Sequence, residues 1–239
     1  MKGLARFAFA TGMLALGATV IAFGDFAQTW VDAPAWIPAH SALASASAAL
    51  MILCGAGLLW SRTERPAAWT LFCYWVLLVV FLELPAVVKH PLIEVAWQGI
   101  AHFGVILAGA WLLATTDARA VRGARLLFGL AMIPIALAHF VYPELTTPLV
   151  PKWVPVPVFW TYFTGAAMFA TAAGALFGVQ ARLAAALQTV LFAMFTFLVW
   201  PPLLLKKPSP FLWSELTISW AICAATWVIA ANLRASART

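Results

Sequence analysis

The residues of this chain that could do chemistry are polar and ionisable side chains inside long apolar stretches. Placing a charged side chain at the centre of a bilayer costs about 2.5–3.5 kcal/mol, so each such residue points to a function. Glu94, Gln98 and His102 recur at every fourth position and therefore share one face of a helix. Together they predict a polar stripe that can hydrogen-bond a ligand and carry protons.

Glu83 is a second candidate, because it lies two residues before Pro85 at the predicted outer end of an apolar stretch. Its carboxyl is a candidate proton carrier or ligand group. The alternative is that Glu83 lies ionised at the level of the lipid headgroups and pairs with Lys89 or His90.

Asp25 and His139 close two further apolar stretches, and Glu144 follows His139 by five residues. An imidazole titrates near neutral pH, so His139 is a candidate proton carrier, with Glu144 expected in the same pocket. The alternative is an interfacial histidine that hydrogen-bonds the proline-rich loop after it.

The composition indicates what must position these residues. The chain is 64% hydrophobic and 9% charged, which is unlike a soluble domain of 239 residues. Eight apolar stretches approach the roughly 20 residues needed to cross a bilayer. They cover residues 5–24, 40–60, 67–85, 95–115, 125–142, 157–178, 183–205 and 211–232. We therefore predict an all-α polytopic membrane protein with eight transmembrane helices.

The sequence also repeats itself at an offset of 117 residues. Ten residues recur at this offset, many of them Trp, Pro, Gly or charged: Pro34, Trp36, Pro38, Met51, Gly57, Leu59, Arg65, Pro85, Lys89 and Pro91. We predict two four-helix repeats, residues 1–118 and 119–239. Both repeats enter from the same side, so an axis along the membrane normal should relate them.

The repeat changes the polar stripe. Glu94, Gln98 and His102 correspond to Phe211, Glu215 and Ser219, so Glu215 is a further candidate. The first repeat has His102 in its stripe, and the second has Glu215 one turn before the position that corresponds to His102. This difference predicts two non-equivalent sites.

The two predicted outer loops, residues 25–39 and 139–158, are too apolar for solvated loops and too rich in proline for continuous helix. We expect them to dip into the interface and cap the helices, because irregular backbone at membrane depth needs a protein cover. Trp36 and Trp153 are candidate lids over a pocket, and the alternative is that both anchor the chain at the bilayer surface.

The basic residues predict the orientation. Ten Lys and Arg residues fall on the side of the two termini and four on the other side, which places both termini in the cytoplasm. The first apolar stretch resembles a signal peptide, but its counterpart in the second repeat indicates a retained helix. The basic residues are scattered over short loops, which excludes a nucleic-acid surface.

Metal and thiol chemistry have little support. Cys54, Cys73 and Cys223 stand alone in predicted helices and are expected to be small buried apolar residues. No two of His40, His90, His102 and His139 have the spacing of metal ligands on one helix, so we predict no metal.

One segment carries a resemblance to a known family. It contains Ala138-His139-Phe140, Pro143-Glu144, Val150-Pro151-Lys152-Trp153-Val154-Pro155 and Phe159-Trp160-Thr161-Tyr162-Phe163-Thr164-Gly165. The segment resembles the DoxX-like family of small bacterial membrane proteins, whose unit is a four-helix bundle, and the whole chain looks like two fused units. The first half departs from the pattern, since Gly24-Asp25-Phe26 stands where the second half has Ala138-His139-Phe140.

The resemblance implies a bacterial inner-membrane protein associated with thiosulfate:quinone or quinol oxidoreductases. From this and the polar residues we expect an accessory component of a membrane redox system that binds a quinone or similar lipophile in an outer-side pocket. Expected partners are the lipid bilayer, a redox enzyme subunit or a second copy of the chain. Two other classes stay open: a small-solute or lipid transporter, and a lipid-modifying, isomerase-like enzyme that uses histidine and carboxyl groups as acid and base.

Overall fold

The computed structural model describes residues 1–26, 38–115 and 117–233. Within these ranges the chain forms helices and no strand, which confirms the predicted all-α class. Part of the first outer loop, including Trp36, lies outside the described residues.

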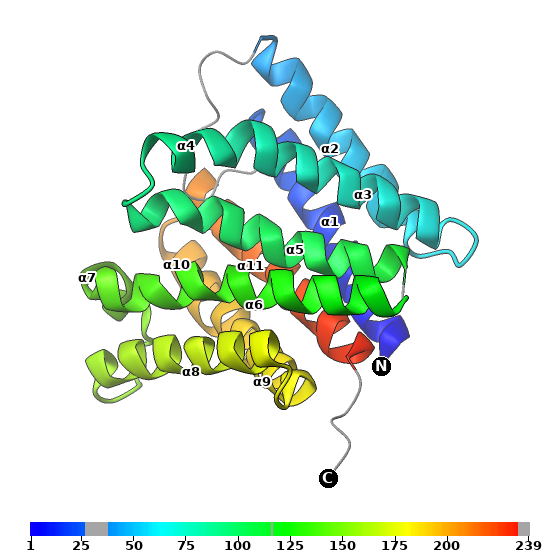
Figure 1. Ribbon diagram of the computed structural model, residues 1–239. Helices are drawn as coiled ribbons and strands as arrows, with labels where there is room; N and C mark the ends of the chain where they lie inside the picture. Colours follow the sequence, from blue (N-terminus) through cyan, green and yellow to red (C-terminus); the bar gives the residue numbers. More distant parts are fainter. Residues whose placement is uncertain (27–37, 116, 234–239) are drawn as a thin grey trace.

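The long helices follow the same order in both halves of the chain (Figure 1). The first half contains α1 (Lys2–Phe23), α2 (His40–Gly57), α3 (Glu64–Leu78), the π-helical turn η1 (Val79–Glu83), α4 (Leu84–Lys89), the 3₁₀ turn η2 (Glu94–Trp97) and α5 (Gln98–Ala114). The second half contains α6 (Ala118–Val141), α7 (Pro143–Thr146), the 3₁₀ turn η3 (Thr147–Leu149), α8 (Pro157–Phe177), α9 (Ala181–Met194), the π-helical turn η4 (Phe195–Val199), α10 (Trp200–Lys206) and α11 (Pro210–Asn232).

Seven helical stretches of the described residues are long and apolar enough to cross a membrane. They are Lys2–Phe23, His40–Gly57, Glu64–Lys89, Glu94–Ala114, Ala118–Val141, Ala181–Lys206 and Pro210–Asn232. The remaining predicted span, residues 157–178, corresponds to α8, which has 21 residues but does not reach the same mean hydropathy. The reason is its content of Trp, Tyr, Thr and Gly, which are less hydrophobic than the Leu, Val and Ile of the other helices.

The long helices pack in a closed ring. The order around the ring is α1, α2, α3, α5, α6, α8, α9, α11 and back to α1, and α5 also packs against α11 across the middle. This contact divides the ring into two lobes. We call α1, α2 and α3 with the two central helices the first lobe, and α6, α8 and α9 with the same two helices the second lobe. Figure 1 shows α2 and α3 at one edge, α8 and α9 at the other, and α5 and α11 between them.

The central position of α5 and α11 follows from their small residues. A Cβ added to Gly109 of α5 would lie 2.9 Å from the Cα of Ala225 in α11. Gly12 of α1 lies almost as close to Ala221 of α11. Small residues allow such close approach of helix backbones. Accordingly, 78% of the most apolar window of Glu94–Ala114 is buried, against 22% for Ala181–Lys206.

Small residues also lie at the contacts of the outer helices. Gly55 of α2 lies against Ala10 and Leu14 of α1, and Gly174 of α8 lies against Ala184 of α9. The prediction for the cysteines is confirmed for Cys54 and Cys223, which are buried, and is wrong for Cys73, which is exposed because it points away from the bundle on α3.

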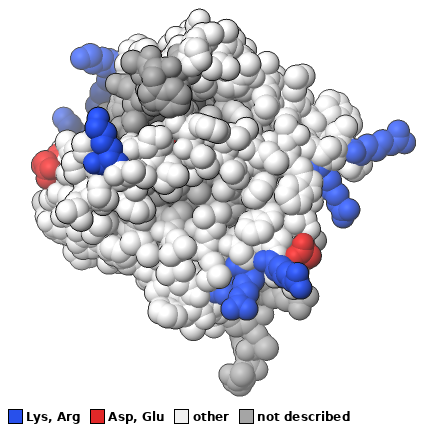
Figure 2. Space-filling model, turned by 45° about the horizontal axis from the view of Figure 1, so that its top comes forward, with Lys and Arg blue, Asp and Glu red and all other residues white. Residues whose placement is uncertain are grey.

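The surface separates charged from apolar residues. Figure 2 shows charged side chains near the margins of the molecule, with a broad uncharged surface between them. Large apolar side chains are exposed on the long helices of both lobes, among them Leu53, Leu77, Phe81, Leu187 and Phe197. An apolar surface of this extent, on helices of this length, is typical of a protein that lies in lipid.

Candidate functional site

A proline shapes the third long helix of each half. Pro85 follows the π-helical turn η1 closely, and Pro201 and Pro202 follow η4. Proline has no backbone N–H, and its ring crowds the carbonyl one turn earlier, so the preceding turn widens. Such π-helical turns are frequent at functional sites. In this protein they set the direction of Glu83, the last residue of η1, and of Trp200, the residue directly after η4.

Glu83 is buried against α5. Its side chain is 5% exposed, and a Cβ added to Gly99 would overlap its carboxylate. The carboxylate therefore occupies space that only a glycine leaves free. Its Oε2 atom has no hydrogen-bond partner among the described residues. The alternative pairing of Glu83 with Lys89 or His90 is not found among the described residues, because the Glu83 side chain is buried between η1 and α5.

Gln98 hydrogen-bonds both Glu94 and the backbone of α6. Its Nε2 donates to Oε1 of Glu94 and, at 3.0 Å, to the carbonyl oxygen of Pro134 in α6. The bond between Gln98 and Glu94 matches the predicted stripe, although Glu94 lies in the 3₁₀ turn before α5. Glu94 is 9% exposed, and its Oε2 has no partner among the described residues. His102 follows on α5 one turn after Gln98.

We call Glu83, Glu94, Gln98 and His102 the first cluster. It gathers two carboxyls, one amide and one imidazole around the first two turns of α5, where α5 meets η1 and α6. The two unpartnered carboxyl oxygens are its main feature, because a buried polar atom without a hydrogen bond costs about 1–3 kcal/mol. A water or a ligand group at this place would remove that cost.

A second cluster lies at the corresponding place in the second lobe. Thr196 of η4 and Ser219 of α11 share a hydrogen bond of 2.9 Å between their hydroxyl oxygens. Further along, the Sγ of Cys223 lies 3.5 Å from the carbonyl oxygen of Thr189. These two contacts show that α9 and α11 run antiparallel.

Trp200 lies four residues after Thr196, and Glu215 lies four residues before Ser219, so both follow the bonded pair toward the same end of these antiparallel helices. Glu215 is 4% exposed, and its Oε1 has no partner among the described residues. The indole Nε1 of Trp200 is also buried without a partner. A donor and an acceptor thus lie beyond the same hydrogen-bonded pair without bonding each other.

His139 of α6 contacts η4, the turn that carries Thr196. Its ring stacks on Phe195 of η4 with centroids 6.3 Å apart, and its Cβ packs on Gly165 of α8. Its Nδ1 lies 3.1 Å from the carbonyl oxygen of Ile135. A carbonyl oxygen only accepts, so Nδ1 carries the proton in this arrangement. Together His139, Trp200, Glu215 and Ser219 form what we call the second cluster.

The remaining predicted residues lie apart from both clusters. Asp25 forms an ion pair with His40 at the start of α2, with 3.3 Å between Oδ1 and Nε2. Glu144 lies exposed on α7, so it does not share a buried pocket with His139. Trp153 is 75% exposed, which fits an interfacial anchor better than a lid. Trp36 lies outside the described residues.

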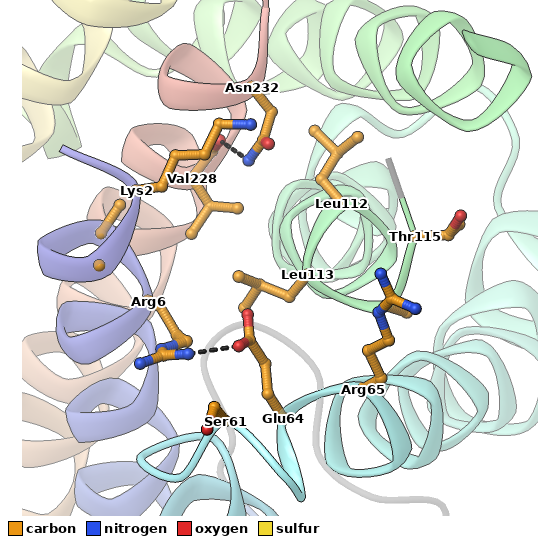
Figure 3. Close-up of a pocket in the computed structure, with 13 residues that line it drawn as sticks. Lys2, Arg6, Ser61, Glu64, Arg65, Leu112, Leu113, Thr115, Val228 and Asn232 are labelled. Carbon is orange, nitrogen blue, oxygen red and sulfur yellow. Dashed lines mark hydrogen bonds and ion pairs between the residues drawn. The ribbon is translucent and has the colours of Figure 1, made fainter. Parts of the chain in front are cut away.

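Two features of the candidate sites were not predicted from the sequence. One is Trp200, which stands 117 positions after Glu83, and this correspondence is the signal that could have identified it. The other is a pocket of about 650 Å³ at the opposite end of the helices. Its polar lining residues are Lys2, Arg6, Ser61, Glu64, Arg65, Thr115 and Asn232 (Figure 3). Among the described residues, no group of three His, Cys, Asp or Glu side chains is placed to hold a metal ion.

Comparison with known proteins gives one match. The family model described as a domain of unknown function (DUF8561) matches residues 128–199. This range runs from α6 through α8 and α9 to the end of η4, so it contains His139 and Glu144 but ends before Trp200 and Glu215. No match is found among the curated proteins or the solved structures.

Proposed function

We propose that this chain is an integral membrane protein with eight spanning helices, the eighth being α8. The seven apolar helices, the exposed apolar side chains and the charged residues near the margins support this proposal. The length of α8 and its packing between α6 and α9 support its assignment as a span.

We also propose that the eight helices form two four-helix repeats related by an axis along the membrane normal. The elements support a duplication: α3 begins at Glu64 and α9 at Ala181, 117 positions later, and a π-helical turn precedes a proline in both halves. The contacts support a two-fold relation. Exchanging the halves converts the α1–α11 contact into the α6–α5 contact and leaves the α5–α11 contact unchanged.

The proposed orientation has both termini on the cytoplasmic side of a bacterial inner membrane. The excess of Lys and Arg on the side of the termini supports it. So does the pocket at that end, where Lys2 of α1 and Asn232 of α11 line the same space.

The function that the geometry supports best is the binding of a lipophilic molecule with a polar, oxygen-bearing head, of the quinone class. The single observation that carries this proposal is that Trp200 Nε1 and Glu215 Oε1 are both buried without partners, each four residues beyond the Thr196–Ser219 hydrogen bond. Binding sites for small molecules combine apolar walls with a few convergent polar groups, and the second cluster has this composition.

The polar atoms match the needs of such a head group. A quinone carbonyl accepts, and the indole N–H of Trp200 is a donor without an acceptor. A quinol hydroxyl donates, and the carboxyl of Glu215 accepts. In its protonated form the same carboxyl donates to a quinone oxygen. In the first lobe the carboxyls of Glu83 and Glu94 have the corresponding free oxygens, so that lobe favours a ligand with donor groups.

On this proposal the chain acts in a membrane redox system as a DoxX-like component that holds the lipophile for a redox enzyme subunit. The support is the resemblance of the segment around His139 together with the place of that histidine beside the second cluster.

The test is the quinone content of protein purified in mild detergent from bacterial membranes. Organic extracts analysed by mass spectrometry should show quinone retained by the wild type. Trp200→Phe removes the N–H and keeps an aromatic ring, so retention should fall about fivefold, the value of one buried hydrogen bond. Glu215→Gln should give a similar decrease. Trp213→Phe is the matched control, because Trp213 lies on α11 with 45% exposure.

Absence of quinone from the wild-type protein, at a detection limit well below one molecule per chain, would overturn the proposal. Equal retention by Trp200→Phe and Trp213→Phe would remove the second cluster as the site.

A further inference from the structure

The pocket at the terminal end of the helices lies far from both clusters and plays no part in the proposed function. It is lined by α1, the turn before α3, α3 itself, α5 and α11. The clusters lie near the starts of α5 and α11, whereas the pocket lies at the ends of these two helices. Its volume of about 650 Å³ is within the range of small-molecule sites, roughly 300–1,000 Å³.

The lining is positively charged. Three lining residues are cationic, Lys2, Arg6 and Arg65, and one is anionic, Glu64. Arg6 forms an ion pair with Glu64, and Figure 3 shows the two side chains meeting between α1 and α3. Among the described residues no carboxylate forms an ion pair with Lys2 or Arg65. Two positive charges are therefore left for an anion in the pocket.

A further carboxylate nearby does not cancel this charge. Asp117 accepts the hydroxyl hydrogen of Thr115, at 3.1 Å, and the backbone N–H of Ala120, at 2.8 Å. It caps the start of α6 and is absent from the pocket lining.

The pocket also has apolar walls. Ala5, Leu112, Leu113 and Val228 contribute to its lining. The amide of Asn232 donates to the carbonyl oxygen of Val228, at 2.9 Å, and so covers a polar backbone atom of α11. A charged lining beside apolar walls suits an anionic group that is attached to an apolar body.

The other half of the chain has a larger side chain at one position of this lining. At an offset of 117 residues, Trp111 of α5 corresponds to Val228 of α11. The indole of Trp111 packs on Gly123 of α6 and on Phe72 of α3, with ring centroids 5.6 Å apart in the second contact. The valine at the equivalent position of α11 is smaller and lines the pocket.

We infer that this pocket binds a phosphate group, with Arg65 and Lys2 as its cationic ligands and Arg6 held in place by Glu64. A guanidinium offers two parallel N–H donors that match phosphate oxygens, and an ammonium adds a point charge. The source of the phosphate is either the headgroup of an anionic lipid or a soluble phosphate. The apolar walls favour the lipid.

The experiment uses the full chain in nanodiscs and measures bound lipid by native mass spectrometry. Phosphatidylcholine discs containing phosphatidylglycerol should give one retained phosphatidylglycerol on the wild type. Arg65→Gln should weaken this binding about tenfold, the value of a hydrogen bond to a charged group. Arg182→Gln is the matched control, because Arg182 is the counterpart of Arg65 in the second half and does not line the pocket.

Val228→Trp introduces the side chain found at the equivalent position of α5 and should close the pocket and abolish retention. If this variant fails to fold, the comparison of Arg65→Gln with Arg182→Gln still decides. Equal effects of these two substitutions would overturn the inference, because they would indicate general surface charge. Failure of the wild type to retain phosphatidylglycerol and to bind inorganic phosphate would overturn it as well.

A separate arm identifies the source of the phosphate. Inorganic phosphate that displaces phosphatidylglycerol at millimolar concentration would support a soluble phosphate. Retention of phosphatidylglycerol that inorganic phosphate does not affect would support a lipid headgroup. Quinone retention should be the same in Arg65→Gln and the wild type, so this result is separate from the test of the second cluster.

Discussion

The two lobes have the same order of long helices but differ in the polar groups that they enclose. At the π-helical turn, the first lobe has Glu83 against Gly99, and the second has Trp200 directly after the turn with its indole nitrogen buried without a partner. At the other end, Val228 of α11 lines a basic pocket, whereas the equivalent Trp111 of α5 packs on Gly123 and Phe72. The same order of long helices is thus compatible with different side chains at equivalent positions.

On the proposed duplication, this difference indicates how one module can give two unlike polar clusters. A proline after a helical turn widens that turn whatever the neighbouring side chain is, so the direction of position 83 or 200 is preserved while its chemistry changes. Since α5 and α11 line both lobes, however, the lobes cannot move apart freely. Substitutions at the contact of α5 with α11, inside the first lobe and at the start of α6 test this difference between the lobes.

The largest effect is expected at the contact shared by both lobes. Gly109→Ala places a Cβ 2.9 Å from the backbone Cα of Ala225, so α5 and α11 must separate. We expect a loss of about 3 kcal/mol in the free energy of unfolding, near the upper end for overpacking. Reversible unfolding in mixed detergent micelles measures it.

Gly104→Ala is the control for this prediction. It lies on the same helix, but its nearest contact is the Cβ of Ala131 at 3.4 Å, an ordinary van der Waals distance. It should be neutral or slightly stabilising, because alanine favours a helix over glycine by about 1 kcal/mol. Equal unfolding free energies for the two variants would contradict the central place of the α5–α11 contact.

A smaller effect is expected inside the first lobe. Gly99→Ala should displace the Glu83 carboxylate and cost about 1 kcal/mol, because a flexible side chain can move and alanine favours the helix. The double variant Gly99→Ala, Glu83→Ala should recover this loss, since the overlap is then absent. A double-mutant cycle of unfolding free energies measures the coupling. A coupling of zero would show that the carboxylate does not lie on Gly99.

The smallest effect is expected at the start of α6, where the halves differ in their caps. Asp117 accepts a hydrogen bond from the N–H of Ala120, whereas Met1 provides no side-chain bond to α1. The backbone N–H of Ala120, and then the hydroxyl of Thr115, hold the pKa of Asp117 below its usual value. A lowered carboxyl pKa means that the stabilisation is present above the usual pKa and is lost as pH falls through the lowered one.

Asp117→Asn keeps a capping oxygen and removes the charge, so the variant should lose this acid-sensitive part of its stability while the helix remains capped. Melting temperatures recorded from pH 6 down to pH 3 measure the difference. Identical pH profiles of variant and wild type would contradict the role of the Asp117 carboxylate.

Much of the fold could be predicted from the sequence. The alternation of apolar stretches long enough to cross a bilayer with short polar turns is a local property of the chain. The eight stretches correspond to the long helices, and the 117-residue offset corresponds to the repeated order of elements. The predicted stripe of Glu94 and Gln98 was also local, since residues four apart on a helix are neighbours.

The interior of the site could not be predicted in the same way. That Glu83 points inward depends on Gly99, sixteen residues later, and on the turn widened before Pro85. The isolation of Asp25, Glu144 and Trp153 from the clusters depends on how the outer ends of the helices pack. The spacing of residues along the chain does not indicate which side chains of different helices are in contact.

The sequence by itself determined the apolar helices, their order, the duplication of their pattern and the turns before the prolines, since all of these depend on residues close together in the chain. The tertiary structure alone decided that α5 and α11 belong to both lobes, that Trp200 Nε1 and Glu215 Oε1 are buried without partners, and that Val228 lines a pocket. These three features depend on which helices pack against each other. Small differences in side-chain volume at each contact determine that packing.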